Sequence, residues 1–218
     1  MTKLLSDYCV YVENHIPSNI CDDLVDLFES VPDHPDKIRM EVQGTSTKTT
    51  FSNTIRFTQF DITKNWELNS KLNNTVCQYL IKAVKDYRTK VEDFDTWAPK
   101  NLYFENLRIK RYISEDKDEF DTHVDVSNDI NEGRYLSFMW YLNDVTDGGE
   151  TEFTGLDFKV QPKKGTLLMF PPFWMYPHKG HLLNSGKKYL LSTYLHYPEP
   201  RKTENPLPLF KLSVEGLQ

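Results

Sequence analysis

The 218-residue sequence predicts an α+β fold that is mainly β, with supporting helices in its N-terminal half. Three observations predict it. Apolar residues recur at helical spacing in two stretches before residue 91, β-prone runs dominate after residue 102, and glycine turn signals such as Asp147-Gly148-Gly149 separate those runs. The length fits one domain, with helical support over about 17–91, a core of strands over about 102–197 and a proline-rich extension over 198–218.

The N-terminal half is expected to hold a short strand at 8–12, two helices and a pair of strands. Ser18 is expected to cap a helix that runs to about residue 30, where the prolines of 32–35 end it. Residues 38–60 predict strands around a polar loop near Gly44. A longer helix is expected from about Trp66 to Val91, packed against a sheet. Its apolar face is expected to comprise Leu68, Leu72, Val76, Leu80, Ala83, Val84 and Tyr87.

Strand signals resume at Leu102–Ile113, where alternation puts four polar side chains on one face: Asn106, Arg108, Lys110 and Tyr112. These positions either line a cavity or face solvent. For Arg108 and Lys110 we expect the surface, because exposed cations outnumber functional ones. The acidic stretch 114–120 is expected to be a solvated rim. The tail from Pro198 onward is expected to pack back on the domain, to mediate a dimer or to be partly disordered, and the sequence does not decide among these.

Composition excludes several classes of function. A net charge of −6 leaves no basic surplus to neutralise phosphates, so nucleic acid is not an expected partner. Three scattered cysteines (9, 21 and 77) indicate reduced thiols. No run is apolar enough to span a membrane and no signal-peptide core is present, so we expect a cytoplasmic protein, monomeric or homodimeric.

One pattern carries metal chemistry. His123 and Asp125 are two residues apart, so on a strand they share a face and can hold one ion together. His178 can join them from a strand that is a neighbour in space, an arrangement that jelly rolls provide. Two histidines and one carboxylate with open positions are the ligand set of non-haem Fe(II) oxygenases. Alone, the H-x-D triplet is a weak signal, because both residue types are common.

Further motifs follow in a fixed order. They are His123-Val124-Asp125, Tyr141-Leu142-Asn143, Gly149-Glu150-Thr151-Glu152-Phe153, Val160 to Gly165, His178-Lys179-Gly180 and Gly186-Lys187-Lys188. In this order and spacing the C-terminal half resembles the prolyl 4-hydroxylase-like branch of the Fe(II)/2-oxoglutarate-dependent oxygenases. The resemblance implies that the core over about 102–197 is a double-stranded β-helix (jelly roll) and that the whole chain is a single oxygenase domain.

The resemblance implies roles for individual residues. His123, Asp125 and His178 are expected to bind iron, and Lys188 to pair with the distal carboxylate of 2-oxoglutarate. Tyr112 and Tyr141 are expected beside the cosubstrate. His178 is expected to be the third ligand in preference to His181, because only His178 stands ten residues before Lys188.

The faces of the last strand matter for the cosubstrate. Alternation puts Lys188 and Ser192 on one face and Lys187 on the other, and Ser192 can add a hydroxyl donor to the same carboxylate. Strand alternation alone does not show which of the two faces points into the protein interior, since both faces carry apolar residues. The offset from His178 favours Lys188.

The resemblance also implies a reaction. Fe(II), 2-oxoglutarate, O2 and ascorbate are the expected cofactors, and hydroxylation of a C–H bond with release of succinate and CO2 is the expected chemistry. Because Asp125 is present, hydroxylation is expected and not halogenation. A peptidyl proline is the leading substrate, with a free amino acid or another small molecule as the alternative. A non-catalytic jelly-roll module, or a cupin-like isomerase or cosubstrate-free dioxygenase, stays open as a different class of protein.

Overall fold

The computed structural model describes residues 3–43, 54–126, 131–197 and 209–212. Three helices are α1 (Ser18–Ser30), α2 (Ser70–Lys90) and α3 (Phe94–Trp97), with 3-10 turns η1 (Leu5–Tyr8) and η2 (Trp66–Asn69). The strands are β1 (Val10–Val12), β2 (Lys37–Gln43), β3 (Thr54–Asp61), β4 (Leu102–Glu105), β5 (Arg108–Ile113), β6 (Glu119–His123), β7 (Arg134–Tyr141), β8 (Thr151–Phe153), β9 (Phe158–Val160), β10 (Leu167–Phe170), β11 (His178–Gly180), β12 (Lys187–His196) and β13 (Leu209–Leu212).

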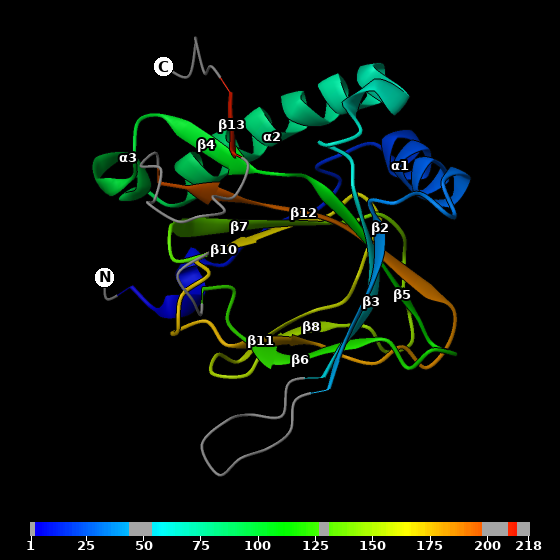
Figure 1. The fold of residues 1–218 in the computed structure, drawn as a ribbon. Helices are drawn as coiled ribbons and strands as arrows, with labels where there is room; N and C mark the ends of the chain where they lie inside the picture. Colours follow the sequence, from blue (N-terminus) through cyan, green and yellow to red (C-terminus); the bar gives the residue numbers. More distant parts are fainter. Residues whose placement is uncertain (1–2, 44–53, 127–130, 198–208, 213–218) are drawn as a thin grey trace.

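The described strands form one curled antiparallel sheet, in the order β1-β10-β7-β12-β5-β3-β6-β11-β8-β9. In Figure 1, β7, β10 and β12 form one layer, and β6, β8 and β11 form a second layer facing it. β3 and β5 lie between the two layers in the strand order, so the sheet is continuous around the curl. Strands far apart in sequence are paired, as β12 with β5 and β7. This arrangement confirms the predicted jelly roll.

Two apolar cores lie on opposite faces of the layer that contains β7 and β12. Along β7, Phe138 and Trp140 belong to the core shared with α1 and α2, whereas Tyr141 belongs to the core inside the curl. Along β12, Leu191 faces the helices and Leu190 faces the interior. Because side chains alternate along a strand, the helices that cover the outer face decide which residues of β12 point inward.

The helices differ in detail from the sequence prediction. Ser18 is the first residue of α1, after Pro17, and its side chain does not cap the helix. The longer helix begins at Ser70, because the Asn69 side chain accepts a hydrogen bond from the Leu72 amide at 3.1 Å. Leu68 therefore lies in the preceding 3-10 turn and is 50% exposed, so its expected place on the apolar face is wrong.

Two peripheral segments extend the sheet. β2 and β3 form the expected pair of strands, although Gly44 and the loop around it lie outside the described residues. β13 pairs with β4, so this apolar piece of the tail packs back on the sheet. None of the described helices is long and apolar enough to cross a lipid bilayer. All three cysteines are free thiols.

Candidate active site

Two histidines face each other across a strand pair inside the curl. β6 ends at His123, β11 begins at His178, and the two residues are directly opposite in the antiparallel register. Their ring centroids lie 4.3 Å apart. The Phe120 ring stacks on the His123 ring at 3.5 Å between centroids, which restricts its orientation. Cross-strand pairing thus brings together two residues that are distant in sequence.

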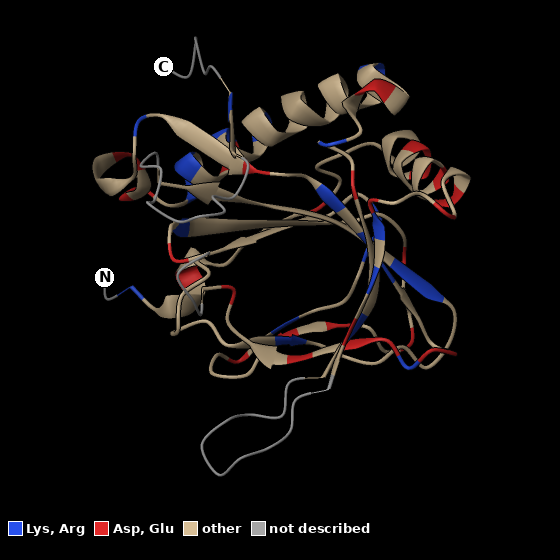
Figure 2. Ribbon diagram, in the orientation of Figure 1, with Lys and Arg blue, Asp and Glu red and all other residues tan. Residues whose placement is uncertain are grey.

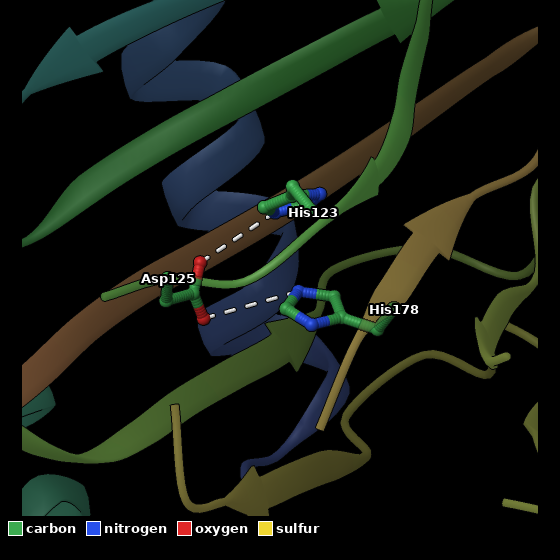
Figure 3. A group of neighbouring side chains, drawn as sticks. All are labelled: His123, Asp125 and His178. Atoms are coloured by element: carbon green, nitrogen blue, oxygen red, sulfur yellow. Dashed lines mark ion pairs between the residues drawn. The ribbon is translucent and has the colours of Figure 1, made fainter. Parts of the chain in front are cut away.

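Each imidazole is oriented by a main-chain carbonyl. Nδ1 of His123 lies 2.8 Å from the Asp121 oxygen, and Nδ1 of His178 lies 3.1 Å from the Tyr176 oxygen. A carbonyl only accepts, so each Nδ1 carries the proton and donates it, and Nε2 keeps its lone pair. Both Nε2 atoms point toward the third member, Asp125 (Figure 3).

Asp125 completes a compact group of ligand atoms. Its Oδ1 lies 3.6 Å from Nε2 of His123, its Oδ2 lies 3.8 Å from Nε2 of His178, and one ligand atom from each residue falls within 4.8 Å of the others. β6 ends at His123, so Asp125 reaches the group from the turn that follows. The expectation that the two residues share one strand face is therefore wrong in detail, although their side chains do converge.

The charge state of this group suits a divalent cation. Burial, with the neighbouring His123, lowers the pKa of His178 to about 4, so this imidazole is neutral near pH 7. Burial alone would raise the pKa of the Asp125 carboxyl, but the imidazoles of His178 and His123 hold that pKa well below its usual range. Two imidazole nitrogens with free lone pairs and one carboxylate are donors that Fe(II) accepts, so the residues present fit this metal.

A buried network holds Asp125 in place. Tyr194 donates its hydroxyl to Oδ1 of Asp125 at 3.1 Å, and Arg134 donates Nη1 to the Asp125 main-chain oxygen at 2.8 Å. Arg134 in turn makes a two-pronged ion pair with Glu105, through Nε at 2.6 Å and Nη2 at 2.8 Å. Sequence reasoning missed all three supporting residues. For Tyr194 a signal existed, since it shares a strand face with Lys188.

Lys188 lies inside the curl and Lys187 is exposed. Lys188 is 1% exposed, its Nζ donates to the Gly149 carbonyl at 2.8 Å, and it lies 4.5 Å from the centroid of the Tyr112 ring. Burial lowers the pKa of this ammonium to about 7, against a smaller opposing effect of Glu150. A buried lysine with no carboxylate in hydrogen-bonding contact among the described residues is costly, which makes Lys188 a candidate functional residue.

The other expected cosubstrate residues surround Lys188. A buried cavity, the inner chamber, is lined by His123, Asp125, His178 and Lys188. Tyr112, which is opposite Lys188 in the register, and Ser192 line the same chamber, and both are 3% exposed. Tyr141 is fully buried and donates its hydroxyl to Oγ1 of Thr151 at 2.8 Å. Thr151, which the sequence analysis names only as part of the motif at 149–153, lines the chamber itself.

Comparison with known proteins agrees with this geometry. Residues 107–196 match the family described as the 2OG-Fe(II) oxygenase superfamily, and this range contains the triad and Lys188. The matched segment is less than half of the chain, and its similarity to this family supports a 2OG-Fe(II) oxygenase. The matched family implies Fe(II), 2-oxoglutarate and O2 as cofactors.

Solved structures extend the likeness beyond the matched segment. A viral collagen prolyl hydroxylase from Paramecium bursaria Chlorella virus-1, in complex with 2OG, is 17% identical, with a TM-score of 0.59 over 88% of this chain and 97% of its own. A Pseudomonas putida prolyl-4-hydroxylase is 14% identical, with a TM-score of 0.59 over 88% of this chain and 94% of its own. A Trichoplax adhaerens prolyl hydroxylase in complex with a hypoxia inducible factor peptide fragment is 14% identical, with a TM-score of 0.60 over 88% and 84%. At this identity the likeness is one of fold, and the fold of the oxygenase is prolyl hydroxylase-like. A search of curated proteins gave no match.

An open cleft of about 810 Å³ leads from the surface of the oxygenase to His123 and Asp125. Arg108 and Lys110 line this cleft, so the expectation that they face outward as surface charges is wrong. The cause is the register of β5 and β12, which places Lys110 opposite Leu190 and Arg108 opposite Ser192, both of which line the inner chamber. The exposed Trp174 contributes to the wall of the same cleft.

Two further positions depart from, or refine, the sequence analysis. Asp118 is fully buried, pairs with Arg39 and accepts a hydrogen bond from the Ile113 amide at 3.0 Å, so the acidic stretch is not wholly a solvated rim. His181 contacts the Glu152 carboxylate and lies outside the triad that includes His178.

Proposed function

We propose that this oxygenase binds Fe(II) through His123, Asp125 and His178 and hydroxylates a C–H bond of a peptidyl proline, with release of succinate and CO2. One observation carries the proposal. Two imidazoles with free Nε2 atoms and a carboxylate converge at the inner end of an open cleft, and the buried Lys188 lines the same chamber. A structural carboxylate–histidine cluster would not need an unpaired cation beside it.

Lys188 is the proposed partner of the distal carboxylate of 2-oxoglutarate. Its ammonium donates to one carbonyl, so two of its protons are free for an acceptor. Ser192 and Tyr112 are proposed to add hydroxyl donors, since both side chains line the chamber. Tyr141 is proposed to contribute indirectly. Its hydroxyl already donates to Thr151, and this hydrogen bond holds the Thr151 side chain in place in the wall of the inner chamber.

The charges of the assembled site support burial of the cosubstrate. Two positive charges of the metal and one of Lys188 balance the single charge of Asp125 and the two charges of 2-oxoglutarate. A neutral assembly avoids most of the desolvation penalty that an unbalanced buried charge would carry.

Bound Fe(II) and 2-oxoglutarate supply the activation of O2 that converts a C–H bond to C–OH. This chain's own residues hold and shield that chemistry. Tyr194 and Arg134 fix Asp125 from its side chain and its main chain, which restricts the carboxylate to one orientation. Leu190 and Phe120 line the chamber with apolar surface and exclude water from it.

The substrate class rests on the structural relatives and on the cleft. The names of the relatives include a collagen prolyl hydroxylase and a prolyl hydroxylase in complex with a peptide fragment, which supports a peptidyl proline here. A cleft of about 810 Å³ offers room for several residues of an extended chain. A free amino acid is the second candidate, favoured by the cations in the cleft wall.

The test compares the amount of succinate formed with the amount of hydroxylated product. Purified protein with Fe(II), 2-oxoglutarate and ascorbate is screened against proline-containing peptides and free amino acids, and succinate and hydroxylated product are quantified together. Equimolar succinate and product are expected, with loss of both in Asp125→Ala and retention in His181→Ala. Product formation that does not require 2-oxoglutarate would reject the proposal.

A further inference from the structure

Lys110 lies in the cleft wall and makes no ion pair with a carboxylate of the described residues. Its side chain is half-buried, and within the described part of the chain no carboxylate forms an ion pair with it. Its Nζ lies over the Phe57 ring, 5.2 Å from the ring centroid. Burial lowers the pKa of Lys110 to about 8, against the opposing influence of Asp125, so the ammonium is still mostly protonated near pH 7.

The carboxylate with the largest electrostatic influence on Lys110 does not neutralise it once the metal is bound. Asp125 is the carboxylate with the largest influence on it, and the proposed function assigns that group to the metal. The charge of 2-oxoglutarate is matched by Lys188, as counted above. Loading the site therefore leaves the positive charge of Lys110 uncompensated.

Arg108 adds a second cation on the same face. Its described ion pair is with Glu105 at 3.5 Å, while Glu105 is bound more closely by Arg134 at 2.6 and 2.8 Å. Arg108 and Lys110 are two residues apart on β5, so their side chains point to the same side. Figure 2 shows blue segments where β2, β3 and β5 run side by side.

The register sets how deep each cation lies. Lys188 is opposite Tyr112, Lys110 is opposite Leu190, and Arg108 is opposite Ser192. Lys110 lines both the inner chamber and the outer cleft, whereas Arg108 lines only the outer cleft. The two cations thus form a path that starts beside the metal-binding candidates and runs outward.

We propose that the substrate of this oxygenase carries a carboxylate close to the C–H bond that is hydroxylated, and that Lys110, supported by Arg108, binds it. This inference rests on the proposed function and narrows its substrate class. Two sources supply such a group: the α-carboxylate of a free amino acid, and an acidic side chain beside proline in a peptide. A carboxylate between the two cations makes charge-assisted hydrogen bonds, which neutral analogues do not make.

The experiment compares acids with their neutral amides. The first pair of probes is L-proline and L-prolinamide. The second pair is a short blocked peptide with glutamate after proline and the same peptide with glutamine. Binding to protein loaded with Fe(II) and 2-oxoglutarate is measured by calorimetry under nitrogen, where turnover is absent. The variants are Lys110→Met and, as a matched control, Lys179→Met, whose side chain pairs with Glu152 beyond the cleft.

In at least one pair we expect the acid to bind at least about tenfold more tightly than the amide. Lys110→Met should reduce that ratio to less than about threefold, and Lys179→Met should leave it unchanged. The pair that shows the effect identifies the source of the carboxylate. Equal binding of acid and amide in both pairs, or a ratio that survives Lys110→Met, overturns the inference.

Two outcomes separate this inference from the function on which it rests. If Lys110→Met weakens 2-oxoglutarate and leaves the acid-to-amide ratio intact, Lys110 belongs to the cosubstrate site and the inference fails alone. If the wild-type protein forms no succinate from 2-oxoglutarate with any probe under air, the proposed function fails as well.

Discussion

Replacing Lys188 by methionine removes the buried ammonium while keeping the length of the side chain. In the unliganded protein the change takes away one hydrogen bond to Gly149 and the contact with the Tyr112 ring. It also removes a desolvated charge, whose pKa burial lowers to about 7. The unliganded variant should therefore be at least as stable as the wild type in thermal unfolding, so lost binding will not reflect misfolding.

The effect on 2-oxoglutarate follows from burial. A carboxylate that enters the chamber without this cation is left unpaired where Lys188 is 1% exposed, at a cost of about 3–5 kcal/mol. At 1.4 kcal/mol per factor of ten, affinity should fall by at least about a hundredfold. Lys187→Met, one residue away and exposed, should change affinity by less than about threefold.

The lowered pKa adds a dependence on pH. The unliganded ammonium is charged below pH 7 and loses its proton above it, and binding of the distal carboxylate requires the charged form. The dissociation constant should therefore be constant below about pH 7 and rise by up to about tenfold per unit above it. Lys188→Met should lack this dependence.

Calorimetric titration of 2-oxoglutarate into the wild type and both variants, under nitrogen with Fe(II), measures all three quantities. A larger loss in Lys187→Met than in Lys188→Met would refute the reasoning, because it would mean that the wrong face of β12 had been assigned to the cosubstrate. A wild-type affinity that is flat from pH 6.5 to 8.5 would contradict the role given to the buried ammonium.

Three further outcomes are expected. His178→Ala should lose iron and His181→Ala should keep it, as measured by metal analysis after gel filtration; full occupancy in His178→Ala contradicts the assignment. Tyr194→Phe removes one donor to Asp125 and should weaken iron binding by about 10–100-fold in a competition titration, whereas an unchanged affinity would leave Tyr194 without a supporting role. Turnover in excess chloride should give only hydroxylated product by mass spectrometry, because Asp125 occupies the position that a halide would need, and a chlorinated product would refute this.

Much of the fold was predictable because the sequence patterns are local. Alternation identified the strands, and the motif order identified the curled jelly roll that joins them. Leu68 was misplaced because a pattern of apolar residues does not show where a helix begins. The side chain of Asn69 decides that by accepting the Leu72 amide.

The site residues were predictable where they lie on one strand or stand at a fixed sequence distance from one another. Lys188 was selected by its offset from His178, while the inward direction of its face depends on α1 and α2 covering the other face, which no local pattern shows. Arg108 and Lys110 were misjudged for the same reason, since strand alternation gives two faces without naming the interior one. Glu105 was not found because its burial depends on pairing with Arg134 from another strand.

We propose that this protein couples O2 to the oxidative decarboxylation of 2-oxoglutarate at the site formed by His123, Asp125 and His178. The most direct test is a reaction under ¹⁸O₂ with Fe(II) and 2-oxoglutarate, followed by mass spectrometry of the succinate. Succinate with one labelled oxygen is expected from the wild type, and none from Asp125→Ala. Unlabelled succinate, or equal labelled succinate from Asp125→Ala, would contradict the account.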